Sequence, residues 1–533
     1  MTGNIDLFYK VYRNTYIRNI IRANVLRDLI INVGNLDYLT DNHNYLETLS
    51  TIDKIHYNIF IRFEINDPDT FAKYTSHPYR HLITCLDLSF NIFQHMEDDV
   101  FDCDLVPQEV QMLSFYTPAT QKGKGTLPQS LTDLRIRNIF SNSKSWLIDD
   151  IMANLPRDLK YLLLPSYDIE APGCVLPANL SRIDYKSNVG CLKNLVGPTD
   201  RVIEGIEVQV ESAEDLDWIE NNKWVNSINT FRLNFADIQI PLHIRKLTGY
   251  FEVNTKDVPS FIESLTCNSL NGSLVSPNIK HIRVSEWLGK LEKGILPVNL
   301  ESLDISEYNF PIEDSVLPSN LQVLNLGTFD QPLELSALPN SLTKLTLFQF
   351  NQPFPSLPNQ LKVLNIPQFT QKTIPIHLIP SSLTRLELNS FDGIFENAEN
   401  GSYQFNHLVS LSVHNINKSI SNILFGSKFI KIGFGAYDND VCLQPIDPSI
   451  RNLCLFFKGE SDINLYPNFL PKSLIKVQLV VFDFFFNLET NSIPEGCKFL
   501  EINNPIDTLN QEVLPKSIKS IKCIPNPFIH DDE

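Results

Sequence analysis

LPVNLESLDISEYNFPIEDSV (296–316), LPSNLQVLNLGTFDQPLELSA (317–337), LPNSLTKLTLFQFNQPFPS (338–356), LPNQLKVLNIPQFTQKTIPIHL (357–378) and IPSSLTRLELNS (379–390) follow one another without a gap. Each begins at a Leu-Pro or Ile-Pro step, with prolines at positions 297, 318, 339, 358 and 380. The period is therefore 21, 21, 19 and 22 residues. Leucine-rich repeats have periods of this length.

Each copy also carries a Leu-x-x-Leu-x-Leu triad. The last two apolar residues of the triad are two apart, as on one face of a β-strand, and the first lies where the chain turns into that strand. The triads are Leu300/Leu303/Ile305, Leu321/Leu324/Leu326, Leu342/Leu345/Leu347, Leu361/Leu364/Ile366 and Leu383/Leu386/Leu388. A unit of about 21 residues cannot bury its own leucines, so it must stack on its neighbours.

Looser triads extend this pattern in both directions. They run from Ile83/Leu86/Leu88 to Ile228/Phe231/Leu233, and from Leu408/Leu411/Val413 to Ile518/Ile521/Cys523. At the repeat length this gives roughly twenty units. We therefore expect a mostly β solenoid, a leucine-rich-repeat-like horseshoe with a parallel sheet on its concave face. The return leg of each unit is short, so we expect it to be irregular, 3₁₀ or polyproline-like, and not a full helix.

A tetrapeptide follows several triads. Phe350-Asn351-Gln352-Pro353 is the full form, Phe329-Asp330-Gln331-Pro332 a near match and Phe369-Thr370-Gln371 a partial one. With the Leu-Pro steps, it resembles the FNIP repeat of social amoebae and giant viruses, and the N-terminal FYKVYRNTYIRNII resembles the start of amoebal members. The resemblance is specific over 296–390, good at 127–186 and 470–525, and weak at 187–295. It implies a leucine-rich-repeat relative with no assigned catalytic residues.

The tetrapeptide has a structural interpretation. We expect its Phe to fill the core on the convex side. We expect the Asn or Asp, the Gln and the Pro to satisfy and end the turn, as short polar side chains do.

Residues 5–31 do not follow the repeat. Their apolar residues fall at i, i+3 and i+4 spacings, which predicts an amphipathic helix, and the segment from Leu46 to Phe63 is a candidate second helix. We therefore divide the chain into a short helical N-terminal cap (1–75), a repeat solenoid (76–526) and an acidic tail (527–533). A cap covers the first repeat of a solenoid. The alternatives are a docking helix, for example an F-box-like adaptor element, and a basic membrane-surface helix.

The charge balance limits the class of partner. The 533 residues include 44 basic and 62 acidic ones, a formal net charge of −18. This charge repels nucleic acid and favours a basic partner. The nine cysteines form neither a disulfide framework nor a zinc motif. The sequence has no apolar run long enough for a membrane span and no signal-peptide pattern at its start, so we expect a cytoplasmic protein.

Motifs that suggest chemistry are weak. His77, His81 and Cys85 have ligand-like spacing, but Pro78 interrupts any helix between them. The segment QKGKGT (121–126) lacks phosphate-loop spacing, so we expect a flexible loop. The aromatic run 481–486 is either core or an exposed partner patch. No nucleophile lies in a recognisable catalytic turn. We expect no enzyme activity, no cofactor, no metal and no small-molecule substrate.

Residues between the core leucines should face outward from the inner side of the sheet. A concave sheet that carries charges, amides and an aromatic side chain is the usual binding surface of a solenoid. The sequence thus predicts a protein-interaction scaffold or adaptor, and alternatively the substrate-recognition subunit of an F-box-like ubiquitin ligase. The predicted partner-binding residues are Asp304, Asn325, Lys344, Thr346, Phe348, Asn365, Arg385 and Glu387, with Val323 and Val363 between them and Arg135 and Arg137 further back.

Overall fold

The fold was obtained as a computed structural model. It describes residues 26–89, 92, 100–117, 122–138, 146–167, 169–230, 238–249, 252–254, 258–271, 276, 278–396, 407–414, 429–434, 450–457, 463–465, 467–468, 470–481, 486–502, 511–518 and 520–523. The chain divides into two compact units, Met1–Thr248 and Gly249–Glu533.

The first unit is a ladder of parallel strands with short elements on the return legs. Its neighbours pair in parallel from one coil to the next. The ladder strands are β1 (Ile30–Val33), β2 (Phe60–Ile65), β3 (Cys85–Leu88), β5 (Met112–Thr117), β7 (Asp133–Asn138), β8 (Tyr161–Leu163), β10 (Arg182–Asn188), β12 (Glu204–Gln209), β13 (Ser227–Asn229) and β14 (Lys246–Thr248). The return legs carry two strand pairs, β4 (Val100–Asp102) with β6 (Lys122–Lys124) and β9 (Cys174–Val175) with β11 (Leu195–Val196).

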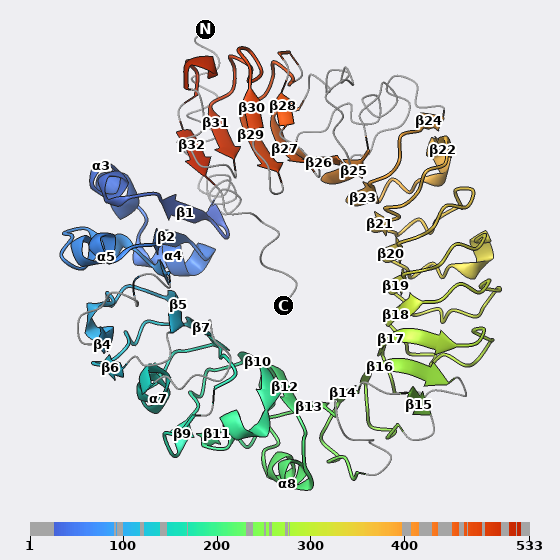
Figure 1. Ribbon diagram of the computed structural model, residues 1–533, viewed down its shortest axis with the longest axis horizontal. Coiled ribbons are helices and arrows are strands. Elements are labelled where there is room, and N and C mark those ends of the chain that lie inside the picture. The colour runs from blue at the N-terminus through green and yellow to red at the C-terminus, as the bar shows by residue number, and fades with distance from the viewer. Residues whose placement is uncertain are drawn as a thin grey trace, which may run out of the picture. The chain divides into compact units, whose positions relative to one another are not determined.

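The second unit repeats this plan. Its ladder strands are β15 (Glu252–Asn254), β16 (Ser264–Asn271), β17 (His281–Leu288), β18 (Ser302–Glu307), β19 (Val323–Leu326), β20 (Lys344–Leu347), β21 (Val363–Asn365), β23 (Arg385–Leu388), β25 (Ser410–Val413), β26 (Phe429–Phe434), β27 (Asn452–Phe457), β29 (Lys476–Val481), β31 (Phe499–Ile502) and β32 (Ser520–Cys523). The outer pairs are β22 (Thr373–Pro375) with β24 (Ile394–Glu396) and β28 (Ile463–Leu465) with β30 (Phe486–Leu488). The strands from β16 to β25 line the inner side of a curved stack (Figure 1).

The leucine triads form the core between the two sides of each coil. Leu321, Leu324 and Leu326 are buried, and the same holds for the equivalent residues of the copies on either side. Each triad leucine contacts its counterparts in the coils above and below, because the strands pair without a shift in register from β18 to β20. The predicted parallel-sheet solenoid is confirmed.

The Leu-Pro step forms a tight turn that leads into each strand. The backbone N–H of Leu321 donates to the carbonyl of Pro318 at 3.1 Å, and Leu342 and Leu361 donate in the same way to Pro339 and Pro358. Proline has no N–H to donate, and here its carbonyl is the group that is needed. The spacing Leu-Pro-x-x-Leu is therefore the length of one hydrogen-bonded turn.

An aromatic ladder fills the outer side of the core, as expected from the tetrapeptide. Tyr308, Phe329, Phe350 and Phe369 are buried, and their ring centroids lie 6.5, 6.4 and 6.3 Å apart in near-parallel stacks. On the strand side, hydrogen-bonded neighbours lie only about 4.8 Å apart. Because the coils are spaced more widely on the outer side, this part of the stack curves with its strands on the concave face.

The polar residues of the tetrapeptide join neighbouring coils. The side chain of Asp330 accepts a hydrogen bond from the N–H of Asn351 at 2.8 Å, and the side chain of Asn351 accepts one from the N–H of Thr370 at 2.9 Å. The amide of Gln352 donates back to Asp330 at 3.1 Å. We expected these side chains to satisfy their own turn, whereas the bonds run to the coil before and the coil after.

The expectations for the return legs and for one triad need correction. The return legs of the second unit contain 3₁₀ segments, η7 (Leu335–Ala337), η8 (Ile376–Leu378) and η10 (Gln511–Val513), as predicted. The first unit also has 3₁₀ segments, η1 (Arg80–Leu82), η3 (Cys103–Leu105) and η4 (Val189–Leu192), but two of its return legs contain full helices, α7 (Trp146–Ala153) and α8 (Ala213–Asn221). A capping box, Ser212 with Asp215, starts α8, and this signal was present in the sequence. Strand β13 centres on Ile228, which is the second residue of its triad and not the first.

The segment predicted as a flexible loop, 121–126, contains strand β6. The N–H of Gly123 donates to the carboxylate of Asp150 at 2.9 Å, and that of Thr126 donates to Asp104 at 3.0 Å. These partners lie 22 and 27 residues away, so no local pattern reveals them.

The N-terminal region mixes helices with ladder strands. The helices α3 (Leu36–Glu47), α4 (Thr51–Tyr57) and α5 (Pro68–Thr75) alternate with β1 and β2. The expected second helix from Leu46 to Phe63 is wrong beyond Tyr57, because Asn58 takes a left-handed conformation, φ 55°, and the chain continues as β2. The predicted helix over 5–31 lies outside the described residues as far as residue 25, and its end is wrong, because Asp28 takes a left-handed conformation and Ile30 and Ile31 belong to β1. The tail 527–533 also lies outside the described residues, and the division at residue 75 stays a prediction.

We predict that Phe350→Ala lowers the free energy of unfolding by about 3–5 kcal/mol, because it leaves a cavity between two stacked rings. Phe348→Ala is the matched control. Its ring is 49% exposed, so the loss should stay within about 0.5 kcal/mol. Urea unfolding followed by circular dichroism measures both. Equal losses in the two variants would contradict the aromatic ladder.

The inter-coil hydrogen bonds give a second prediction. Asn351→Asp should leave stability nearly unchanged, because Asp330 accepts the same backbone bond one coil earlier. Asn351→Leu removes the acceptor for the Thr370 N–H and should cost about 1 kcal/mol. The midpoint of urea unfolding distinguishes the two, and an Asp variant as unstable as the Leu variant would refute the assignment.

Candidate functional site

The predicted binding residues lie together on the solvent-exposed side of β16–β25, which we call the strand face. Parallel register aligns Val323, Lys344, Val363 and Arg385 in one row, and Asp304, Asn325, Thr346, Asn365 and Glu387 in a second row. Buried leucines alternate with them. Phe348 directly follows β20 and is half-exposed, whereas Thr346 is almost covered. Whether these residues bind a partner stays a prediction.

Ion pairs on the strand face share one asymmetry. The guanidinium of Arg283 lies 3.1 Å from the carboxylate of Asp304, and the Arg side chain is 71% exposed against 20% for the Asp. Arg385 and Glu387 lie 3.8 Å apart, with 56% and 29% exposed. In both pairs the cation is the more exposed partner and the carboxylate is the more covered one.

This asymmetry follows from side-chain length. The short stem of Asp keeps its carboxylate near the backbone, whereas the long stems of Arg and Lys extend along the surface and carry the charge outward. Lys344, between the two pairs, is exposed as well. The described ladder pairs of the first unit, such as Arg182 with Asp184, have the same order.

The first unit has its own network on the same side of its ladder. Arg135 donates two hydrogen bonds to Asp133, at 2.9 and 3.0 Å, and its guanidinium lies 5.3 Å from the ring centroid of Tyr161. Tyr161 donates to Asp184 at 2.6 Å, and Arg182 donates to the same carboxylate at 2.8 Å. Burial and the bond to Asp184 raise the pKa of Tyr161 to about 12.

Sequence reasoning found only part of this network. Arg135 was predicted to face outward, but Tyr161 and Asp184 were not named. Tyr161 directly precedes the buried Leu162, so the alternation used for the other repeats was sufficient to place it. Its contact with Asp184 joins neighbouring coils, and that required the structure. Arg137, the other predicted residue, donates to the hydroxyl of Tyr116 at 3.1 Å.

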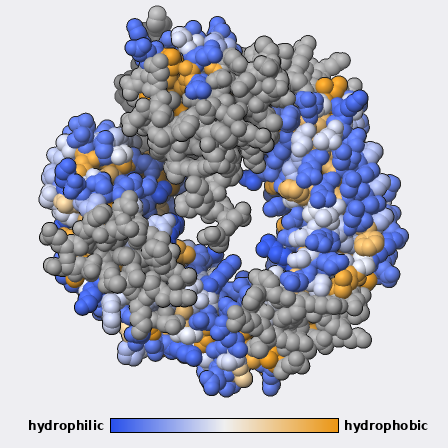
Figure 2. Space-filling view, viewed as in Figure 1, coloured by the Kyte–Doolittle hydropathy of each residue, from blue (hydrophilic) through white to orange (hydrophobic). Residues whose placement is uncertain are grey.

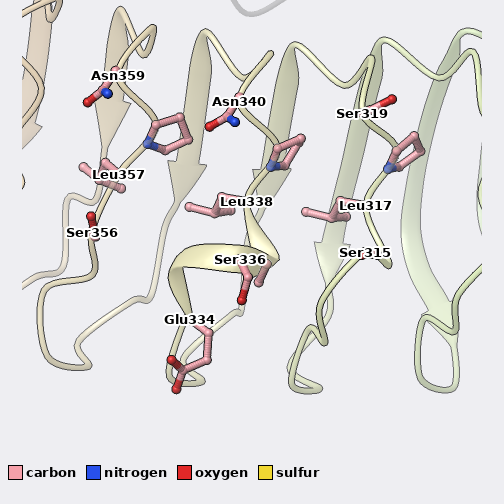
Figure 3. Close-up of a pocket in the computed structure, with 14 residues that line it drawn as sticks. Ser315, Leu317, Ser319, Glu334, Ser336, Leu338, Asn340, Ser356, Leu357 and Asn359 are labelled. Carbon is pink, nitrogen blue, oxygen red and sulfur yellow. The ribbon is translucent and has the colours of Figure 1, made fainter.

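Two hollows accompany these surfaces in the second unit. A cleft of about 360 Å³ on the strand face is lined by residues of β16–β20, among them His281, Arg283, Asp304 and Lys344. A groove of about 940 Å³ lies at the Leu-Pro turns, where Leu317, Leu338 and Leu357 stand side by side in successive coils (Figure 3). The surface over β16–β23 is mostly hydrophilic (Figure 2).

Several thiols and a histidine outside the strand face are covered or hydrogen-bonded. Burial raises the pKa of the thiols of Cys85, Cys103 and Cys267 to about 12, which keeps them protonated. His77 contacts Thr40 through Nε2 at 3.1 Å and accepts from the N–H of Tyr79 through Nδ1 at 3.2 Å. The described residues contain no group of three or more His, Cys, Asp or Glu arranged to hold a metal ion.

The geometry of the coils agrees with a family profile. The FNIP repeat profile matches residues 287–329, 308–349 and 329–369. Residues 287–369 are FNIP repeats. The profile matches cover the coils that carry the aromatic ladder and the hydrogen bond between Asp330 and Asn351. The FNIP tetrapeptide therefore has a structural role in these coils. Each unit is a parallel-strand solenoid of stacked coils with buried leucines.

Two solved structures are similar to this chain. One is CroV588, described as a novel circular LRR protein, with 18% identity and a TM-score of 0.33 over 86% of this chain and 69% of that chain. The other is the plant peptide hormone receptor RGFR1 in complex with RGF2, with 15% identity and a TM-score of 0.28 over 88% of this chain and 77% of that chain. No curated protein sequence matches this chain. Among the described helices, none has the length and apolar character needed to cross a membrane.

The raised thiol pKa values predict slow alkylation. At about pH 8 only about one in ten thousand of these thiols is a thiolate, and the folded coils cover them. Iodoacetamide should leave Cys85, Cys103 and Cys267 unlabelled in the folded chain and label them in guanidinium chloride. Peptide mass spectrometry measures this, and rapid labelling of Cys85 in the native chain would contradict the burial.

Proposed function

We propose that this chain is a non-catalytic scaffold or adaptor that binds a protein partner on the strand face of the second unit. The proposal depends chiefly on one observation, the continuous double row from Asp304 to Glu387, where charged, amide and aliphatic side chains share one register. Solenoids commonly use such extended concave surfaces for binding.

The composition of the strand face supports a protein partner. Arg and aromatic side chains dominate binding energy at protein interfaces, and Arg385 and Phe348 are exposed here. Arg283 and Arg385 are held by neighbouring carboxylates, which lowers the entropy lost on binding.

A cytoplasmic setting is part of the same proposal. Cys85, Cys103, Cys174, Cys267 and Cys497 are buried thiols outside any disulfide, and no disulfide is needed where stacked coils supply the core. Free thiols persist most readily in the reducing cytosol.

A ligase-type adaptor remains the second candidate, because helix α4 presents an apolar surface. Ile52 and Ile55 are 79% and 67% exposed, while Lys54 between them is buried. A helix that exposes isoleucines and buries a lysine is suited to dock against another protein. On this proposal the N-terminal region would contact a ligase subunit and the strand face would select the substrate.

Affinity purification from the native cell tests the first candidate. The variant Lys344→Glu/Phe348→Ala/Arg385→Glu should lose at least one partner that the wild type recovers, because it reverses two charges and removes the exposed ring. The control Lys293→Glu/Phe310→Ala/Lys372→Glu makes similar changes away from the two rows and should keep every partner. Retention of all partners by the first variant would refute a strand-face interaction.

The ligase candidate has a separate test in the full chain. Ile52→Asp/Ile55→Asp should abolish recovery of a ligase subunit and leave strand-face partners in place. If no ligase subunit is recovered even with the wild type, the scaffold proposal stands alone.

A further inference from the structure

The two rows of the strand face, taken with Arg283, carry three cations and two carboxylates in a chain that is acidic overall. The net charge is −18, yet within these rows the exposed charged groups are the cations Arg283, Lys344 and Arg385, while the carboxylates Asp304 and Glu387 are partly covered. Screening in physiological salt limits the reach of distant charges to about 8 Å. A peptide segment of a partner that approaches these rows therefore contacts the exposed cations first.

The cleft of about 360 Å³ lies between two of these cations. The cleft extends from β16 to β20, with Arg283 on β17 and Lys344 on β20, and Ser302, Asp304, Val323 and Asn325 line it between them. Three strand spacings separate β17 from β20, about 14 Å, and Lys344 is offset by two residues along the strands, because Arg283 is in register with Thr346. The long side chains of Arg283 and Lys344 can reach across this offset. The floor offers hydroxyl and amide groups that hydrogen-bond to a peptide backbone.

We propose that this cleft binds an extended acidic segment of a partner protein, laid across the strands from β17 to β20. The inference rests on the proposed function and names the chemistry of the partner. One carboxylate of the segment contacts the guanidinium of Arg283, and a second contacts the ammonium of Lys344.

The spacing of the two cations defines the segment. An extended chain advances about 3.3 Å per residue, and side chains of residues i and i+4 lie on the same side about 13 Å apart. This matches the separation of the strands that carry Arg283 and Lys344. The expected motif is therefore an acidic residue, three intervening residues and a second acidic residue.

Carboxylates on the same strands restrict where the segment lies. Glu286 and Glu307 are exposed, aligned in register, and three residues beyond Arg283 and Asp304 along their strands. They repel an acidic segment displaced in that direction. Lys344 and Arg385 lie in one row on the opposite side from these glutamates. A longer acidic segment therefore continues across the strands from β21 to β23, and not along them.

Fluorescence polarisation with the full-length chain tests the proposal. The probe is the labelled peptide Gly-Thr-Glu-Thr-Val-Thr-Glu-Thr-Gly. Its controls carry lysine or glutamine at both glutamate positions, or place the second glutamate one residue earlier. We expect saturable binding of the probe at least tenfold tighter than that of any control, and weakening as salt rises. Arg283→Glu and Lys344→Glu should each weaken binding at least tenfold, and Lys293→Glu should not.

Circular dichroism and thermal melting show that the variants fold. Absence of saturable probe binding, equal binding of the lysine peptide, or unchanged affinity in both charge reversals would overturn the proposal. Partner capture separates this result from the broader function. If the variant Lys344→Glu/Phe348→Ala/Arg385→Glu still loses its partner while the acidic probe fails, the acidic motif is wrong and strand-face binding stands.

Discussion

Every coil of this chain depends on its neighbours for its core. A repeat of about 21 residues cannot enclose its own leucines, so each triad is buried only when another triad stacks on it. Three sets of contacts repeat at the same interval: the leucines behind the strands, the rings from Tyr308 to Phe369, and the bonds through Asp330 and Asn351. Loss of one coil therefore exposes the core of the next.

The same stacking shapes the surface. Wide ring spacing on the outer side and narrow strand spacing on the inner side curve the coils, which makes the ladder concave over these repeats. Strict alternation along each strand then separates packing from recognition. Leu324 and Leu326 serve the core, and Asn325 between them is left to face solvent. Residues on the strand face can vary in charge without disturbing the spine.

Charge illustrates why the whole-chain total is a poor guide to the partner. The excess of acidic residues favours a basic partner, but Arg283 and Arg385 are more exposed than the carboxylates with which they pair. This difference in exposure arises from the length of the side chains and not from the composition of the chain. Rows with nearly equal numbers of acidic and basic residues therefore expose their cations more than their carboxylates.

The sequence by itself determined the repeat, the parallel ladder and which side of each strand is buried, because a Leu-Pro turn and a two-residue alternation are local. It also named the rows from Asp304 to Glu387. It missed β16 and β17, whose triads begin with Ile262 and Ile279 and lack the Leu-Pro step, and it missed the helices α7 and α8 of the first unit.

Only the tertiary structure decided which side chains of neighbouring coils are in contact. The bond from Tyr161 to Asp184, the pairing of Arg283 with Asp304 and the return of Gln352 to Asp330 each join residues 21 to 23 positions apart. A one-residue change in the length of any intervening return leg would break these contacts. Their geometry is therefore fixed by the register of the stacked coils, which no single repeat contains.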